Sequence, residues 1–453
     1  MTAIINSKVG LNRGKSRVWI EGRKLEREGF SVGKRYDVKV SEASISLTLS
    51  EDGRYIVSKR TRNGQTSPII DLNGSVVSDS FEVESLIRIV VSNDKITIRM
   101  HHSTELQNER EERLLRKLKA GESLSVCSLC HGLGILDSAI DAGMTESGIK
   151  SVIAVAVEQE KKYLEGSLNN NPQLWDSNSC IIESPIESVN LMKNPTQVDT
   201  LIIGLPCTGF SRSGPSKLSL SCPEAHSKSG SLFFFMLSFI QVLNPSTVVI
   251  ECVPEIFGSF SMIIIRSVLE GLRYSLSERI LEGGEFGSLE NRKRACIVAI
   301  SNGIADGYDI KGIKPLRQKE SCIQDILEDV PLDSDRWKPF DYLVAKEIRD
   351  KAAGKGFARQ IVTGKESQCG VITRGYFKCR SGDVYLSHPT DKKLTRLFST
   401  VEHARLKTIP ENIIRGLSQS TSHEALGQSC IYAAFKAVGV HLANHLNRWQ
   451  AQY

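Results

Sequence analysis

A cysteine and a glutamate stand just beyond two apolar runs of the chain. Cys207 lies in Pro206-Cys207-Thr208-Gly209-Phe210, shortly after the run 201–203, and Glu251 directly follows the run 248–250. Strand ends of a parallel sheet meet at one edge, so both groups are expected at one crevice. A thiolate attacks an electron-poor carbon while an acid supplies a proton, which suits covalent catalysis on a heteroaromatic ring. The alternative is that Cys207 is a small buried hydrophobe.

The elements around these two groups are those of an α/β domain. Apolar runs alternate with helical stretches from about Ser123 onward, and the runs are 124–129, 152–157, 181–182, 200–203, 247–250 and 295–300. This alternation predicts a doubly wound, mostly parallel sheet. A glycine turn, Gly132-Leu133-Gly134, separates the first strand from a helix over 135–142, and Glu158 closes the next strand. That arrangement predicts a nucleotide-type cofactor site, with the acid on ribose hydroxyls.

Composition limits the class of protein. The 453 residues suffice for two or three domains, and 40% hydrophobic and 24% charged residues are ordinary for a soluble globular protein. The net charge of +6 is compatible with a polyanionic partner. We expect a cytoplasmic protein without signal peptide or membrane segment, since no apolar run approaches about 20 residues. The 11 scattered cysteines indicate free thiols. Cys127 and Cys130 form a CxxC without a second pair at zinc spacing, so no metal site is predicted.

Residues 1–100 are predicted to form a β-rich domain. Short β-branched or aromatic runs are separated by turn signals, and the runs are 18–20, 36–40, 45–49, 55–57, 86–91 and 95–100. Within residues 17–40 a strand, a short helix ending in Gly29-Phe30 and a Gly33-Lys34 turn resemble the swapped-hairpin barrel of SymE-type and AbrB-type proteins. The resemblance implies nucleic-acid binding or dimerisation, with a basic face from Lys8, Arg13, Lys15, Arg17, Arg23 and Lys24. The alternative is a β-module that only supports the next domain.

The segment 101–122 is predicted to be a charged linker helix. Residues 102–119 are dense in Glu, Arg and Lys, which is typical of a solvent-exposed helix.

The motifs from 123 to 440, in their order, resemble the DNA (cytosine-5) methyltransferases. The matching segments are Cys130-His131-Gly132-Leu133-Gly134, Glu158, the Pro-Cys loop 204–211, Glu251-Cys252-Val253, the Gln-x-Arg-x-Arg segment 289–294, the helix region 394–410 and Gly427-Gln428-Ser429. The resemblance implies S-adenosylmethionine as cofactor, held by Cys130, Gly132, Gly134, Glu158, Pro206, Gly427, Gln428 and Ser429. It implies Cys207, Glu251, Arg292 and Arg294 as catalytic residues.

The implied reaction agrees with the chemistry of the two groups. Cys207 adds to C6 of a cytosine, Glu251 acts at N3, and C5 becomes nucleophilic enough to accept a methyl group. Arg292 and Arg294 would hold the O2 and phosphate side of the target, although two surface charges are the alternative. The target atoms lie inside a duplex, so the base must be flipped out.

Several positions depart from the family pattern. Cys130 replaces an aromatic residue and Cys252 an asparagine, and a thiol cannot supply the amide hydrogen bonds that brace the Pro-Cys loop. The adenine-binding segment is matched only by Ser184-Pro185-Ile186, without an aspartate. Glu290 replaces a glutamine and Gln428 an asparagine. Because Cys207 and Glu251 remain, we expect an active enzyme.

Residues 305–393 are predicted to be the target-recognition domain, and 394–453 to return to the catalytic domain 123–304. Basic residues interleaved with aromatics and glycines suit contacts to double-stranded DNA. The predicted DNA-binding residues are Ser211, Arg212, Lys355, Arg359, Arg374, Lys378 and Arg380, and the polar stretch 211–217 matches the loop that closes over the flipped base.

Three questions stay open at this level. One is which alternative to an active DNA enzyme could apply. The substrate could be RNA, or the catalytic half could have decayed and left a DNA-binding protein. Another is whether the N-terminal domain makes a homodimer. The third is the biological purpose, for which nucleoid association and a prokaryotic or mobile-element origin are expected.

Overall fold

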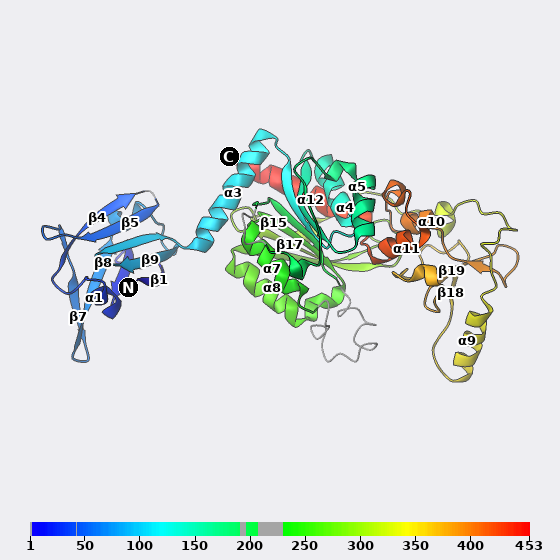
Figure 1. The fold of residues 1–453 in the computed structure, drawn as a ribbon, viewed down its shortest axis with the longest axis horizontal. Coiled ribbons are helices and arrows are strands. Elements are labelled where there is room, and N and C mark those ends of the chain that lie inside the picture. The colour runs from blue at the N-terminus through cyan, green and yellow to red at the C-terminus, as the bar shows by residue number, and fades with distance from the viewer. Residues whose placement is uncertain (1, 42, 191–195, 207–229) are drawn as a thin grey trace. The chain divides into compact units, whose positions relative to one another are not determined.

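The chain folds as two units, 1–109 and 110–453, each with its own hydrophobic core. The computed structural model describes residues 2–41, 43–190, 196–206 and 230–453 (Figure 1). Within these ranges no helix is long and apolar enough to cross a membrane.

The first unit is built from two antiparallel sheets that share one core. The sheet orders are β1-β9-β10-β5-β4-β6 and β2-β3-β8-β7. All six predicted strands are found, and β1, β2, β7 and β8 add to them. The strands are β1 (Ala3–Lys8), β2 (Gly10–Asn12), β3 (Lys15–Glu21), β4 (Arg35–Ser41), β5 (Ser44–Leu49), β6 (Tyr55–Ile56), β7 (Ser58–Arg62), β8 (Gln65–Asn73), β9 (Leu86–Ser92) and β10 (Lys95–Met100).

A strand–helix–strand motif occurs twice in this unit. Helix α1 (Arg23–Arg27) joins β3 to β4, and α2 (Ser75–Ser78) joins β8 to β9. Each helix follows a left-handed glycine, Gly22 or Gly74, and each is followed by a buried phenylalanine, Phe30 or Phe81. Both helices contact β3 and β8, which pair with each other. The sequence indicated only the first copy, and the second lets one chain close the core by itself.

The predicted charged helix forms as α3 (His102–Ala120), but it is not solvent-exposed throughout. From Arg110 onward it packs on the second unit, and the Arg110 side chain is buried. A buried guanidinium is tolerated because its donors find acceptors. Its partners are Ser301 Oγ, Asn244 Oδ1 and the carbonyl oxygens of Leu272 and Arg273, with the Tyr274 ring beneath it. Because the helix is densely charged, its sequence gives no indication that Arg110 is buried.

The second unit contains a seven-stranded sheet in the order β13-β12-β11-β14-β15-β17-β16. The strands from β13 to β15 are parallel, which confirms the predicted mostly parallel α/β class. The predicted strand 295–300 is β17, which runs antiparallel between β15 and β16. The strands are β11 (Leu124–Leu129), β12 (Ser151–Glu158), β13 (Cys180–Glu183), β14 (Thr200–Gly204), β15 (Thr247–Cys252), β16 (Tyr274–Glu282) and β17 (Lys293–Ser301).

Helices cover both faces of this sheet (Figure 1). One face packs against α4 (Ile135–Glu146) and the C-terminal α12 (Tyr432–Gln450), the other against α7 (Leu232–Leu243) and α8 (Phe260–Gly271). Two glycines let α4 and α12 approach closely. A Cβ on Gly143 would lie 2.1 Å from the Lys436 carbonyl oxygen, and one on Gly439 would lie 2.3 Å from that of Ile140.

The predicted recognition segment is irregular, and its small core is shared with Leu289, Phe398 and Leu406 of the flanking segments. Its elements, and those of the C-terminal return, are η5 (Ile310–Gly312), η6 (Ile323–Ile326), α9 (Asp341–Ala352), β18 (Gln360–Val362), η7 (Tyr376–Lys378), β19 (Val384–Ser387), β20 (Thr395–Arg396), α10 (Thr400–Leu406), η8 (Glu411–Ile414) and α11 (Gln419–Gln428). The remaining described elements of the second unit are α5 (Lys161–Asn170), η1 (Pro172–Leu174), η2 (Ile186–Ser188) and η4 (Pro254–Gly258).

Candidate active site and cofactor loop

The glycine turn after β11 is a sharply left-handed loop. Cys130, Gly132 and Gly134 have φ angles of 53°, 57° and 71°. Only glycine fits at Gly134, because a Cβ there would lie 2.6 Å from Ser167 Oγ and 2.8 Å from His131 Nε2. At Gly132 a Cβ would meet nothing within 4 Å. The backbone at Gly132 therefore faces open space, as a loop that receives a ligand requires.

Glu158 lies at the end of β12, against this loop. Its Oε2 accepts the Gly132 N–H at 2.7 Å and its Oε1 accepts the Glu160 N–H at 2.8 Å. Each oxygen keeps acceptor capacity, because a carboxylate has about four lone-pair sites. The Ser184 N–H donates to the Glu158 carbonyl oxygen, which brings the segment predicted to contact adenine beside the acid. These residues fit a cofactor with a ribose and a charged tail.

The buried side chain of His131 holds the loop in place. The sequence analysis predicted no role for this residue. Its ring is buried, with Nδ1 2.9 Å from Ser128 Oγ and 3.1 Å from Asp137 Oδ2. Its Nε2 lies 2.7 Å from Ser167 Oγ, and Trp175 packs edge-on at 5.2 Å. A histidine between two glycine-turn positions gives no sequence signal of such a role, since its partners come from elsewhere along the chain.

The edge that leads to the predicted nucleophile is formed by β14 and β15. Gly204 is the register partner of Glu251, and the Leu205 N–H donates to the Glu251 carbonyl oxygen at 2.8 Å. The Cys252 thiol lies 3.5 Å from the Leu205 carbonyl oxygen and donates to it. Cys252 thus does brace the base of this loop, through its S–H rather than an amide. The chain is described to Pro206. Cys207, Ser211, Arg212 and the stretch 211–217 lie outside the described residues.

Glu251 forms an ion pair with Arg294 of β17, in which Glu251 Oε1 lies 2.5 Å from Arg294 Nε. Each side chain is 11% exposed. Burial raises the pKa of Glu251 above its usual range, although Arg294, Arg292 and Lys407 act in the opposite direction. The carboxyl therefore holds a proton more readily than an ordinary glutamate, which is the state that donates to a ring nitrogen.

Arg292 is a buried residue whose described hydrogen bonds are all to protein groups. Its side chain is buried, and its Nε donates to Glu290 Oε1 at 2.8 Å. Its Nη2 donates to the carbonyl oxygens of Ile372 and Gly427, at 2.7 and 3.0 Å. In this structure Arg292 braces the recognition segment and the C-terminal return, because main-chain carbonyls and a buried acid take up its donors. Its role in holding target oxygens stays a prediction.

Glu290 and Lys407 complete a buried charge network that sequence analysis missed. Both side chains are fully buried, and Lys407 Nζ lies 3.4 Å from Glu290 Oε2. Lys407 also donates to the Leu426 carbonyl oxygen, and the Ile372 N–H donates to Glu290 Oε1 at 3.1 Å. The glutamate in place of a glutamine was the available signal. Its partner, more than a hundred residues later, could not be identified from the sequence.

The C-terminal return places Gly427, Gln428 and Ser429 near the arginine pair. A Cβ on Gly427 would lie 2.4 Å from the Thr373 carbonyl carbon, so glycine is required where α11 meets the recognition segment. The Ser429 carbonyl oxygen accepts from Arg294 at 3.4 Å. Gln428 Nε2 donates to the Tyr163 hydroxyl of α5 at 3.1 Å. The described contacts of these three residues are with protein groups, and their cofactor role stays a prediction.

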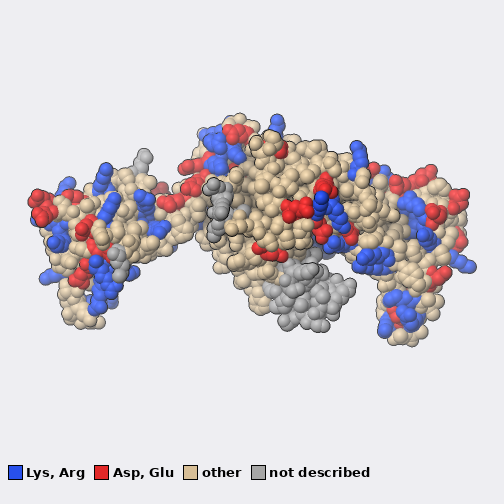
Figure 2. Space-filling view, in the orientation of Figure 1, with Lys and Arg blue, Asp and Glu red and all other residues tan. Residues whose placement is uncertain are grey.

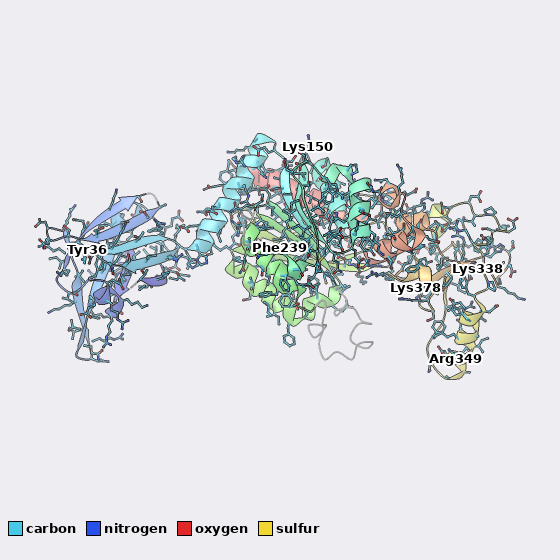
Figure 3. All side chains as sticks on the ribbon, in the orientation of Figure 1. Tyr36, Lys150, Phe239, Lys338, Arg349 and Lys378 are labelled. Carbon is cyan, nitrogen blue, oxygen red and sulfur yellow. The ribbon has the colours of Figure 1, made fainter. Side chains whose placement is uncertain are left out.

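The predicted DNA-binding residues of the recognition segment are mostly exposed. Lys355, Arg374, Lys378 and Arg380 are on the surface, and Figure 3 shows Lys378 together with Lys338 and Arg349 in this segment. Arg359 is partly buried and tied to Glu347, with Nε 2.8 Å from Oε2. It is therefore less available to a ligand than the other four.

Two further features bear on the site. Among the described residues no group of three or more His, Cys, Asp and Glu is arranged to hold a metal ion. Burial raises the pKa of Cys130 to about 12, so this thiol stays protonated. A cavity of 580 Å³ lies elsewhere in the unit, and no residue of the predicted site lines it. Its lining includes Arg317, Arg405, Pro410, Tyr432 and Lys436.

Comparison with known proteins decides the family. Residues 124–443 match the family model described as C-5 cytosine-specific DNA methylase. This chain belongs to that family. The family predicted from the order of the motifs is therefore confirmed, and with it the class of DNA cytosine-5 methyltransferases. The resemblance of residues 17–40 to swapped-hairpin barrels stays a prediction.

Curated relatives of this methylase are type II methyltransferases. M1.ScrFI of Lactococcus lactis subsp. cremoris is 26% identical over 249 residues, which are 53% of this chain and 61% of the relative. M.Eco47II of Escherichia coli is 23% identical over 403 residues, or 79% of this chain and 90% of the relative. The chain thus spans less than two thirds of the Lactococcus protein and most of the Escherichia protein.

Solved structures share the fold of the methylase. The S. pombe Dnmt2 methyltransferase superposes with a TM-score of 0.55 at 20% identity, covering 72% of this chain and 99% of that protein. The Entamoeba histolytica methyltransferase gives 0.56 at 18% identity, covering 72% and 98%. These likenesses show the architecture of the second unit.

Proposed function

We propose that this protein transfers a methyl group to C5 of a flipped-out cytosine in double-stranded DNA through a covalent adduct of Cys207. The observation that carries the proposal is the register of β14 and β15. This register places Gly204 beside Glu251, which forms an ion pair with Arg294. Gly204 lies three residues before Cys207 along the chain. A nucleophile and an acid are thereby supplied by adjacent strand ends.

The chemistry follows from the two groups. Cytosine C5 is a weak nucleophile until a thiolate adds to C6 and gives C5 enamine character. Glu251 hydrogen-bonds or protonates N3 and stabilises the charge that develops on the ring. Arg294 holds the Glu251 carboxyl in place through their ion pair. Removal of the C5 proton and elimination of the thiol then complete the cycle.

The cofactor that fits the glycine loop is S-adenosylmethionine, which supplies an electrophilic methyl group when bound. Gly132 offers an open backbone surface, and Glu158 has spare acceptor capacity for ribose hydroxyls. Gly134 and His131 keep the turn in its shape. The adenine contact is the least defined part, since Ser184-Pro185-Ile186 brings no aspartate.

Duplex DNA is the proposed substrate because the chain has a separate, irregular segment with exposed basic side chains. Trp337 and Tyr376 of this segment belong to a small buried core that Phe398 of the C-terminal return completes. Figure 2 shows Lys and Arg side chains over this part of the second unit, with acidic residues among them. Basic side chains on an ordered scaffold suit phosphate contacts and base-edge contacts. The two curated relatives named above come from bacteria, which fits an enzyme that modifies bacterial DNA.

Nucleoside mass spectrometry of DNA from a methylation-free host tests the proposal. Expression of the protein is expected to produce 5-methylcytosine, and Cys207→Ser to produce none. A duplex with 5-fluorocytosine at the target should trap a protein–DNA adduct with the intact thiol, because fluorine at C5 blocks the final elimination. Modified cytosine in transfer RNA but not in DNA would overturn the substrate assignment. No modified cytosine in either would favour a decayed DNA-binding protein.

A further inference from the structure

The four-stranded sheet of the first unit has one buried and one open face. Val18 and Ile20 of β3 point into the core. The register pairs Arg17 with Asn73 and Trp19 with Asp71. Successive residues of a strand point to opposite faces, so Arg17 and Trp19 lie on the face turned away from the core.

The neighbouring strand β7 adds basic side chains to the same open face. Arg60 pairs with Ser67 and Arg62 with Gln65, and these β8 residues alternate in phase with Asp71. All five residues of β7 are exposed. The side chain of Lys15 in β3 points to the same open face as Arg17, because the two residues lie two positions apart in the strand.

Trp19 lies between two guanidinium groups. The guanidinium carbons of Arg17 and Arg60 are 4.2 and 5.8 Å from its ring centroid. Arg17 donates to both oxygens of Asp71 at 2.7 and 3.0 Å, and Arg60 donates to Glu21 at 2.9 Å. An arginine has five N–H donors, so each keeps several for a ligand. The acids and the indole hold the guanidinium groups in fixed positions, which lowers the entropy cost of binding.

The open face is positive overall. Asp71 and Glu21 balance only Arg17 and Arg60. Lys15 and Arg62 are exposed and form no ion pair with a carboxylate among the described residues. Figure 2 shows Lys and Arg side chains as blue atoms on the part of the first unit that carries β7.

The hairpin of β7 and β8 projects from the unit. Its turn residues, Asn63 and Gly64, have φ angles of 50° and 77°, as a tight two-residue hairpin requires. The exposure of every β7 residue means that this end of the ribbon is not packed against the core (Figure 1). A two-stranded ribbon has the width that the major groove of DNA admits.

We propose that this basic ribbon face, formed by Lys15, Arg17, Trp19, Arg60 and Arg62, is a second binding surface for duplex DNA. It contacts phosphates, with the β7–β8 ribbon placed along or in a groove. The choice of duplex DNA rests on the proposed function, because a surface on the same chain as a DNA methylase shares its substrate at high effective concentration. No specific base contact is required for this role.

Equilibrium binding of the full-length protein to a long duplex, measured across about 50–200 mM salt, tests the surface. The test variant is Lys15→Glu with Arg62→Glu. Each lost phosphate contact lowers the slope of log affinity against log salt by about 0.9, so a decrease of about 2 is expected. At the lowest salt the affinity should fall at least about tenfold.

A matched control carries the same charge change on the other sheet of this unit. Lys39→Glu with Arg99→Glu alters two exposed residues of β4 and β10 and should keep the wild-type slope. The milder Lys15→Gln with Arg62→Gln should reduce the slope in the same direction, which excludes misfolding as the cause. Equal effects of test and control variants, or none in either, would overturn the proposal.

Methyl transfer separates this proposal from the proposed function. On a short duplex at saturating concentration the Lys15/Arg62 variant should react at the wild-type rate. If no DNA is methylated by any form but the salt slope still changes, the proposed function fails and the surface stands. A competition experiment compares a stem-loop RNA with a DNA duplex of equal length. If the RNA displaces the wild-type protein from the long duplex better than the DNA does, and the variant loses this preference, the assignment to DNA is overturned.

Discussion

The Glu251 carboxyl is subject to two opposing influences. Burial raises its pKa, while Arg294, Arg292 and Lys407 lower it, and burial is the larger influence. A carboxyl that is easily protonated is useful where a ring nitrogen must receive a hydrogen bond or a proton. The residue that the sequence singled out at a strand end thus has the electrostatic surroundings of a general acid.

Replacing Glu251 by glutamine should lower kcat for methyl transfer by about 10²–10⁴-fold, since the amide cannot give up a proton. Cofactor affinity should remain close to that of the wild type. Glu282→Gln, on an exposed carboxylate of β16, is the matched control.

The pH dependence has a defined sign. The protonated form is retained to a higher pH than in an ordinary glutamate, so the rate should fall as pH rises through the raised pKa. Glu251→Gln should lose this limb of the profile. A rate profile that is identical in wild type and Glu251→Gln would contradict the acid role.

The network of Glu290, Arg292 and Lys407 holds three chain segments together at residue scale. Burial and Arg292 lower the pKa of Lys407 well below its usual range, while Glu290 acts in the opposite direction. The pKa of Glu290 is lowered overall, because Arg292 and Lys407 outweigh the effect of burial. Glu290 is the counter-charge of both buried cations, whereas the two cations disfavour each other's charge.

A double-mutant cycle measures this interdependence. Glu290→Gln alone should destabilise the second unit by about 3–5 kcal/mol, because Lys407 and Arg292 lose their buried counter-charge. Combining it with Lys407→Met should cost less than the sum of the single changes. Calorimetric unfolding of the four proteins gives the coupling. An additive result would show that the pair contributes no mutual stabilisation, and Glu282→Gln, in an exposed pair with Lys293, should change stability by about 1 kcal/mol or less.

At the scale of elements, the loop between β11 and α4 gives its two glycines different tasks. Gly134 is enclosed by Ser167 and His131, whereas Gly132 opens on free space, although both have positive φ angles. One glycine is required by packing and the other by what must approach the backbone. The shared sequence pattern conceals this difference, because it depends on atoms from α5 and the loop itself.

Alanine substitutions should separate the two tasks. Gly134→Ala should lower the unfolding temperature of the second unit the most, since the left-handed backbone costs about 1–2 kcal/mol and the Cβ clashes in addition. Gly132→Ala should carry only the backbone cost but weaken S-adenosylmethionine binding in calorimetric titration. Gly148→Ala, which is left-handed and open but outside the loop, is the control. Equal effects of Gly132→Ala and Gly148→Ala on cofactor affinity would contradict the ligand-facing role.

At the scale of the whole molecule, two hydrophobic cores lie in two units of one chain. The first core is closed by the repeated strand–helix–strand motif, and the cores of the second unit lie on the two faces of its sheet. Residues that share one hydrophobic core unfold together, so units with separate cores are expected to melt separately.

Calorimetry should therefore resolve two unfolding transitions. Ile89→Ala, in the core of the first unit, should shift one transition by the equivalent of about 2–5 kcal/mol, and Ile140→Ala should shift the other. S-adenosylmethionine should raise only the transition that responds to Ile140→Ala, because a ligand stabilises the unit that binds it. A single transition that shifts with both variants would contradict independent cores.

Much of the second unit could be predicted because its signals are local. An apolar run such as 200–203 specifies a buried parallel strand by composition alone, and the glycine turn and Pro-Cys loop follow their strands directly. The antiparallel β16 was missed because its residues are largely half-exposed and its pairing with β17 is a tertiary contact. The second copy of the motif in the first unit was missed because few residues repeat between the copies.

The sequence by itself determined the family, the order of the strands along the chain, and the candidate residues Cys207, Glu251 and Glu158. It did so because residue type and spacing carry that chemistry. Only the tertiary structure decided what each charged group does. Arg292 and Arg294 have the same type and lie two residues apart, yet one is bound to main-chain carbonyls and the other to Glu251. Burial and partners arise from segments far apart in the chain, and these contacts set charge state and access.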